Sequence, residues 1–171
     1  LCSWLAYLFG EYEIASSAIS RRNEVEKNAN KKIEMYGLVT FIDCLTYLAS
    51  SIKRKQNNLT SEFSEKLKGM KKLVSYSPRN NQHKMLLIEA ELAYLKNDFD
   101  VAMEKYDAAI IAAELIGYIH EQALCNEKAG DFFLSQGNMT RATSHYSNAI
   151  DLYRKWGAQA KVDHLCKHVP L

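Results

Sequence analysis

The chain has little glycine, little proline and no long apolar run. Of its 171 residues only seven are glycine and two, Pro78 and Pro170, are proline, which leaves little backbone free to cradle a phosphate group. No stretch approaches the ~20 consecutive apolar residues that cross a bilayer. The opening segment LCSWLAYLF lacks the basic flank and the cleavage site of a signal peptide. We therefore expect no membrane attachment.

Motifs of catalysis and of redox chemistry are missing as well. There is no GxxxxGK[ST] or GxGxxG phosphate loop, and no kinase or hydrolase signature. The four cysteines lie far apart without a CxxC pair, a pattern typical of thiols in a reducing compartment. These absences predict a cytoplasmic, non-enzymatic segment without a cofactor. The sequons at Asn58 and Asn138 are then chance matches.

Apolar residues recur at spacings of three and four nearly throughout, which predicts an all-α protein. Pro78 and its neighbours predict a loop from Ser75 to Asn81, and Thr60 is expected to cap the helix that follows it. No low-complexity linker divides residues 1–171, so we expect a single helical-repeat domain. The missing initiator Met and the start within an apolar run predict a fragment of a longer chain. The expected helices are 1–9, 12–28, 33–56, 60–76, 80–96, 99–116, 118–136, 139–156 and 158–168.

The chain repeats itself. Shifting it by 40 residues places the turn at Asn97 on that at Gly137, and a shift of 87 residues places the turn at Gly10 on that at Asn97. Each turn begins with a residue that tolerates the left-handed conformation. An apolar residue expected to enter the core follows, then an alanine that allows close helix contact, then a bulky side chain. These sets are Tyr12, Ala15 and Ile19; Phe99, Ala102 and Tyr106; and Met139, Ala142 and Tyr146.

Small and large residues in this order are typical of tetratricopeptide hairpins, here lengthened from ~34 residues by longer helices. Gly117 and Gly157 fall on each other in the 40-residue shift and mark the break after the second helix of two pairs. The pattern predicts a tetratricopeptide-like, right-handed α-solenoid of antiparallel helical hairpins.

Candidate chemical groups lack the partners that a site needs. His164 and His168 lie one helical turn apart, but a metal site requires at least a third ligand, so we expect no metal. Ser144 and His145 are adjacent on a helix and diverge by about 100°, without a third group to orient the imidazole. The carboxylate pairs Glu89–Glu91 and Glu121–Glu127 do not share a helix face. Glu91 and Glu127 are interpreted as groove residues or helix-surface charges.

Two basic segments leave nucleic-acid binding open as a less favoured alternative. Residues 1–85 hold 14 Lys and Arg against 8 Asp and Glu, and SIKRKQ (51–56) and KLKGMKKL (66–73) concentrate this charge. Phosphate contacts would use such residues. The competing interpretation is that the lysines keep a helix soluble while Leu67, Met70 and Leu73 face the core.

The second half resembles the closing helical segment of very large sensor histidine kinases. In that family a serine/threonine-kinase-like domain and an AAA-type ATPase module precede a tetratricopeptide-like region, followed by GAF and histidine kinase domains. Upstream, SPRNNQHKMLLIEAE (77–91) is similar to the family's loop and helix entry. The residues that carry the resemblance are Gly117-Tyr118, Glu121, Ala123-Leu124, Asn126-Glu127, Ala129-Gly130, Phe132-Phe133-Leu134, Gly137, Ala142, Tyr153, Trp156-Gly157-Ala158, Ala160-Lys161-Val162, Leu165 and Pro170.

The resemblance implies a scaffold or relay between nucleotide-binding and sensory modules, with no catalytic residue in this segment. We expect protein–protein or interdomain contact through a groove lined by the first helix of each hairpin. The expected groove residues are Glu91, Tyr94, Glu127 and Asp131. A free-standing adaptor that captures a peptide is the alternative.

Overall fold

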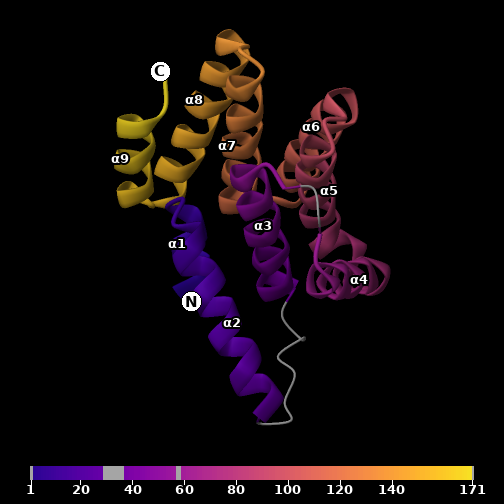
Figure 1. The fold of residues 1–171 in the computed structure, drawn as a ribbon. Coiled ribbons are helices and arrows are strands. Elements are labelled where there is room, and N and C mark those ends of the chain that lie inside the picture. The colour runs from indigo at the N-terminus through magenta and orange to yellow at the C-terminus, as the bar shows by residue number, and fades with distance from the viewer. Residues whose placement is uncertain (1, 29–36, 57–58, 171) are drawn as a thin grey trace. The chain divides into compact units, whose positions relative to one another are not determined.

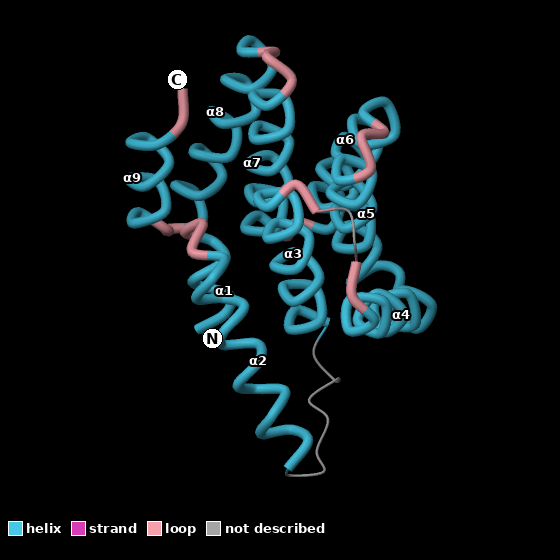
Figure 2. Tube along the Cα trace, in the orientation of Figure 1, coloured by secondary structure: helices cyan, strands magenta, loops and turns pink. Residues whose placement is uncertain are grey.

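The structure is a computed structural model that describes residues 2–28, 37–56 and 59–170, and these residues form helices and turns without a strand (Figure 2). The expectation of an all-α chain is confirmed for them. The helices, labelled in Figure 1, are α1 Cys2–Leu8, α2 Tyr12–Asn28, α3 Gly37–Arg54, α4 Ser61–Tyr76, α5 Pro78–Leu95, α6 Phe99–Ile116, α7 Ile119–Ser135, α8 Met139–Trp156 and α9 Gln159–His168. Within the described ranges, none of them combines the length and apolarity needed to cross a membrane.

The predicted loop around Pro78 is wrong. Helix α4 continues to Tyr76 and α5 begins at Pro78, so only Ser77 separates them. Proline fits the first position of a helix because its missing amide would have no helical partner there. The side chain of Asn81 donates to the carbonyl oxygens of Leu73 at 3.3 Å and Ser77 at 3.1 Å, which satisfies groups that a helix end leaves free.

Thr60 caps α4 as predicted, since its hydroxyl oxygen accepts from the amide of Phe63 at 3.2 Å. Residues 33–36 of the expected third helix, and Asn58 of the first sequon, lie outside the described residues.

The first of two compact units comprises residues 1–81. In it α1 and α2 pack against each other and both contact α3, while α4 packs against α3. Phe41, Leu45, Phe63 and Met70 are among its fully buried side chains.

The second unit comprises residues 82–171. Its helices pack in chain order, α6 against α7, α7 against α8, and α8 against α9. The side chains of α5 meet those of α6, where Tyr94 and Phe99 approach with ring centroids 6.4 Å apart. Helix α7 is buried along most of its length and contributes Phe132 and Phe133 to the core. The expectation that residues 1–171 form one domain stays a prediction.

The three repeated turns have the predicted backbone. Gly10, Asn97 and Gly137 adopt φ of 75°, 61° and 72°, the left-handed region that ends a helix. Gly117 and Gly157, with φ of 81° and 86°, end α6 and α8 in the same way. The repeat therefore holds at the level of backbone conformation.

The side chains of the repeat follow the prediction in part. Ala15, Ala102 and Ala142 are fully buried, as are the bulky residues Ile19, Tyr106 and Tyr146. Phe99 and Met139, expected in the core, remain 39% and 52% exposed. They occupy the first positions of α6 and α8, directly after the left-handed turns.

Candidate functional site

Two tyrosine–carboxylate hydrogen bonds obey the internal repeat. The hydroxyl of Tyr106 on α6 donates to Oε1 of Glu91 on α5 at 2.8 Å. The hydroxyl of Tyr146 on α8 donates to Oδ1 of Asp131 on α7, also at 2.8 Å. Each tyrosine follows its carboxylate by 15 residues, so the shift of 40 residues superposes both partners of both bonds. The repeat thus extends from core packing to polar chemistry.

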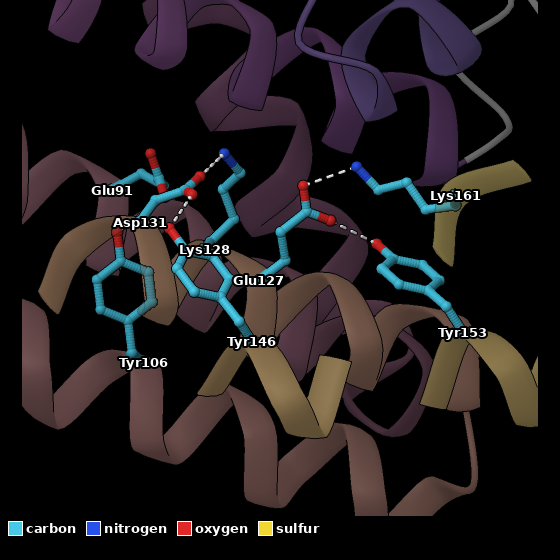
Figure 3. Close-up of polar contacts among 8 residues, drawn as sticks. All are labelled: Glu91, Tyr106, Glu127, Lys128, Asp131, Tyr146, Tyr153 and Lys161. Carbon is cyan, nitrogen blue, oxygen red and sulfur yellow. Dashed lines mark hydrogen bonds and ion pairs between the residues drawn. The ribbon is translucent and has the colours of Figure 1, made fainter. Parts of the chain in front are cut away.

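Two lysines and a third tyrosine continue these contacts along α7 (Figure 3). Lys128 donates to Oδ2 of Asp131 at 2.6 Å. Glu127 accepts from Lys161 of α9 at 2.7 Å through Oε1, and from the hydroxyl of Tyr153 of α8 at 2.9 Å through Oε2. We call this set the polar network. Its members are Glu91, Tyr106, Glu127, Lys128, Asp131, Tyr146, Tyr153 and Lys161.

The ring of Tyr146 lies directly beside a glycine of α7. A Cβ built on Gly130 would lie 2.6 Å from Cε1 of Tyr146, closer than two carbon atoms can approach. Gly130 therefore leaves room beside α7 for the Tyr146 ring, whose hydroxyl bonds to Asp131. In the 40-residue shift Gly130 corresponds to Ala90, which precedes Glu91 and is fully buried.

Burial decides the electrostatics of the first pair. It raises the pKa of Glu91 above its ordinary value, against the opposing effects of the Lys128 charge and the Tyr106 hydrogen bond. Burial, and then the neighbouring Glu91 carboxylate, raise the pKa of Tyr106 well above its ordinary value. Burial and Asp131 raise the pKa of Tyr146 likewise. These tyrosines therefore stay protonated and act as hydrogen-bond donors across the physiological pH range.

A second buried polar cluster joins α5 and α7, and the sequence did not reveal it. Nε2 of His83 bonds to Oε2 of Glu121, and Lys84 lies 3.2 Å from the other carboxylate oxygen. Burial alone would raise the pKa of Glu121, but the His83 bond and the Lys84 charge outweigh it and lower the pKa. Tyr118 packs edge-on against the His83 ring. The signal available in the sequence was that His83, Lys84 and Glu121 lie on helices with many apolar residues.

The predicted groove residues are now placed. Glu91 and Glu127 are buried in the polar network, so their interpretation as helix-surface charges is wrong. The cause is that each carboxylate has a tyrosine donor, and Glu127 also a lysine, which offsets the cost of removing it from water. Tyr94 is half-buried against Phe132, and the side chain of Asp131 is 44% exposed. The groove itself stays a prediction.

The remaining chemical candidates have structural partners. The ring of His145 stacks on Phe133 with centroids 5.3 Å apart, and its Nδ1 lies 3.2 Å from the side-chain oxygen of Asn126. Burial lowers the pKa of His145. His164 and His168 stack on each other at 4.4 Å. In the described ranges no three His, Cys, Asp or Glu side chains gather in a way that would hold a metal ion.

The basic segments of the first unit are partly neutralised by acids within that unit. Lys66 lies 3.1 Å from the buried carboxylate of Asp43, which Arg22 also contacts at 2.5 Å. Lys53 lies 3.2 Å from Glu13. Met70 is buried as predicted, whereas Leu67 and Leu73 are only half-buried.

No protein-family model, curated protein or solved structure matches the chain. Two parts of the chain do resemble each other, since the Glu91–Tyr106 pair corresponds to the Asp131–Tyr146 pair.

Proposed function

We propose that the chain is a non-catalytic, tetratricopeptide-like scaffold that mediates protein–protein or interdomain contact. In the more specific form of the proposal it links ATPase and sensor or kinase modules in a signal-transducing histidine kinase of the cytoplasm. The observation that carries the proposal is the 40-residue repeat, which relates left-handed turns, buried alanines and tyrosine–carboxylate bonds alike. Repetition of one hairpin is how solenoid proteins build extended contact surfaces.

The polar network supports a structural role for the carboxylates, which in an enzyme could act as catalytic acids or bases. Glu91 and Glu127 each accept from a tyrosine hydroxyl, and Glu127 also accepts from Lys161. Bonds of this kind fix the orientation of neighbouring helices, because a buried carboxylate that loses its donor is strongly destabilising. Such bonds hold the two helices of one hairpin together, and the Lys161–Glu127 bond extends this link to α9, so that displacement of one helix passes to its bonded neighbour.

Within this proposal the partner lies along the first helices of the hairpins, α5 and α7. Asp131 and Tyr94 are the groove residues with exposed surface. Asp131 supplies an acceptor already oriented by Tyr146 and Lys128, and Tyr94 supplies a ring edge beside Phe99 and Phe132. An extended segment with a donor next to an apolar side chain fits this combination.

The relay is tested in the full-length parent protein by measuring histidine autophosphorylation as a function of added nucleotide. One form carries the native segment, and the other replaces it with a helical spacer of equal length. Loss of the nucleotide response with retained basal phosphorylation supports the relay. An unchanged response overturns it.

A matched pair of point variants tests the groove, and urea unfolding of both variants accounts for any stability lost because Asp131 also bonds Lys128 and Tyr146. Asp131→Asn keeps the shape of the side chain but removes its charge from the groove, whereas Asp151→Asn makes the same change on the exposed face of α8. A scaffold that uses the groove loses regulation only with the first variant. Equal behaviour of both variants removes the groove from the proposal. Peptide capture by the isolated chain without any effect in the parent would favour the free-standing adaptor instead.

A further inference from the structure

The outward face of α6 carries an apolar stripe that the corresponding helix of the repeat lacks. Ile111 and Leu115 are 56% and 81% exposed, and Val101 on the same face is 38% exposed. The half-buried Ala108 lies between them. The 40-residue shift replaces these residues with the polar residues Arg141, Asn148, Asp151 and Lys155 of α8. Because both helices share one core pattern, the stripe is not a requirement of the fold.

The stripe has the spacing of a coiled-coil seam. Val101, Glu104, Ala108, Ile111 and Leu115 are separated by alternating steps of three and four residues. In heptad terms Val101, Ala108 and Leu115 take position a, and Glu104 and Ile111 take position d. A seam of this kind seats the apolar side chains of a second helix between its own. The buried side of α6, with Ala102 and Tyr106, is already used by the core.

One edge of the seam is uniformly acidic. Asp100, Asp107 and Glu114 follow one another at steps of seven residues, all exposed, and occupy position g. The single basic residue of α6, Lys105, lies on the opposite edge and pairs with Glu89 of α5 at 2.9 Å. Flanking charges at e and g positions select the partner of a coiled coil. In an antiparallel pair of α6 helices the two acidic rows would face each other, and in a parallel pair only Lys105 would offer them a positive charge, so the acidic row disfavours self-association through this face.

We propose that the outward face of α6 binds an amphipathic helix whose apolar seam is flanked by lysine or arginine. Ile111 and Leu115 provide the apolar anchors, and Asp100, Asp107 and Glu114 select the basic edge of the partner. This surface adds to the scaffold function and is separate from the groove residues, because Tyr106 of the same helix is directed inward to Glu91.

The test uses the 171-residue chain and a labelled synthetic helix of about three heptads, with Leu at a and d and Lys at e and g. A second peptide has Glu in place of every Lys. Fluorescence anisotropy should show binding of the Lys peptide, weakened by salt, and none of the Glu peptide. Ile111→Ser together with Leu115→Ser should weaken binding about tenfold or more. The control Met139→Ser removes an exposed apolar residue elsewhere and should leave affinity unchanged.

A charge exchange keeps the test independent of those apolar substitutions. Asp107→Lys with Glu114→Lys should transfer binding from the Lys peptide to the Glu peptide. Asp151→Lys with Asp163→Lys changes the net charge equally on exposed positions of α8 and α9 and should not. Circular dichroism establishes that each variant is folded. Absence of Lys-peptide binding, equal binding by all variants, or self-association that Ile111→Ser abolishes would each overturn the proposal, the last by identifying a second copy as the occupant.

Discussion

Gly130 of α7 and Tyr146 of α8 are in direct contact, and a Cβ at Gly130 would lie 2.6 Å from the tyrosine ring. The ring has no room to retreat, because it is fully buried and its hydroxyl is bonded to Asp131 at 2.8 Å. The contact therefore links a glycine inside a helix, which is otherwise unfavourable, to the position of a repeated hydrogen bond.

Gly130→Ala should destabilise the chain by about 1–3 kcal/mol, because the clash with a fixed ring exceeds the helix propensity that alanine adds. Urea unfolding followed by circular dichroism measures the change. Gly69→Ala is the control, since a Cβ there would meet only Thr40 at 3.9 Å. The control should be neutral or stabilising by up to about 1 kcal/mol. Similar behaviour of both variants would show that the Tyr146 ring moves aside.

Overpacking of the repeat alanines gives a second prediction. Ala102→Leu or Ala142→Leu should cost about 1–3 kcal/mol, because both side chains are fully buried and a larger side chain would overpack the core there. Thermal melts detect the loss, and Ala160→Leu on the exposed side of α9 is the control. A neutral result at Ala102 and Ala142 would mean that they do not set the helix spacing.

The repeat could be predicted from the sequence because few residue types satisfy its backbone conformation and its packing. A left-handed turn favours glycine or asparagine, which identified Gly10, Asn97 and Gly137. A close helix contact favours alanine, which identified Ala102 and Ala142. The sequence did not predict that Phe99 and Met139 are exposed, because they are apolar like core residues. In the structure they occupy the first positions of α6 and α8.

The polar network was not predicted from the sequence, because carboxylates occur both on helix surfaces and in buried hydrogen bonds. An analysis of helical periodicity assigns carboxylates to the surface, so it predicts that Glu91 and Glu127 are exposed. In the structure both are buried, because tyrosine and lysine side chains donate hydrogen bonds to them. One signal was present. The shift that relates Tyr106 to Tyr146 also relates Glu91 to Asp131, and a carboxylate kept opposite a buried tyrosine indicates a hydrogen bond.

The two repeated tyrosine bonds should differ in strength. Tyr106→Phe leaves the buried Glu91 without its hydroxyl donor and should cost about 1–3 kcal/mol. Tyr146→Phe should cost about 1 kcal/mol or less, because Asp131 keeps Lys128 at 2.6 Å and is 44% exposed. Denaturant unfolding of both variants compares them directly. Equal losses would indicate that Glu91 finds another donor when Tyr106 is removed.

Glu91 should make stability depend on pH. Burial holds its pKa in the folded chain above the ordinary value of 4.5, so between the two values the folded state binds more protons than the unfolded state. Stability then falls as pH rises through that window, by about 1.4 kcal/mol for each unit by which the pKa is raised. Glu91→Gln should remove this contribution and flatten the curve, measured by urea unfolding between about pH 4 and pH 8. Glu89→Gln, on a half-buried residue of the same helix, is the control. Parallel curves for Glu91→Gln and the unaltered chain would show that folding does not change the pKa of Glu91.

Lys161 should be the costliest member of the polar network to remove. It is buried and donates to Glu127 at 2.7 Å, so Lys161→Met leaves a buried carboxylate with Tyr153 as its donor and without its counter-charge. Breaking one side of a buried ion pair costs about 3–5 kcal/mol. Adding Glu127→Gln removes the uncompensated charge and keeps an acceptor for Tyr153, so the double variant should regain part of the stability. A double-mutant cycle by denaturant unfolding gives the coupling energy, and additive losses would mean that Lys161 and Glu127 act independently.

Lys167→Met, at an exposed position of α9, should leave stability unchanged, because it removes a solvated charge without uncovering a buried one.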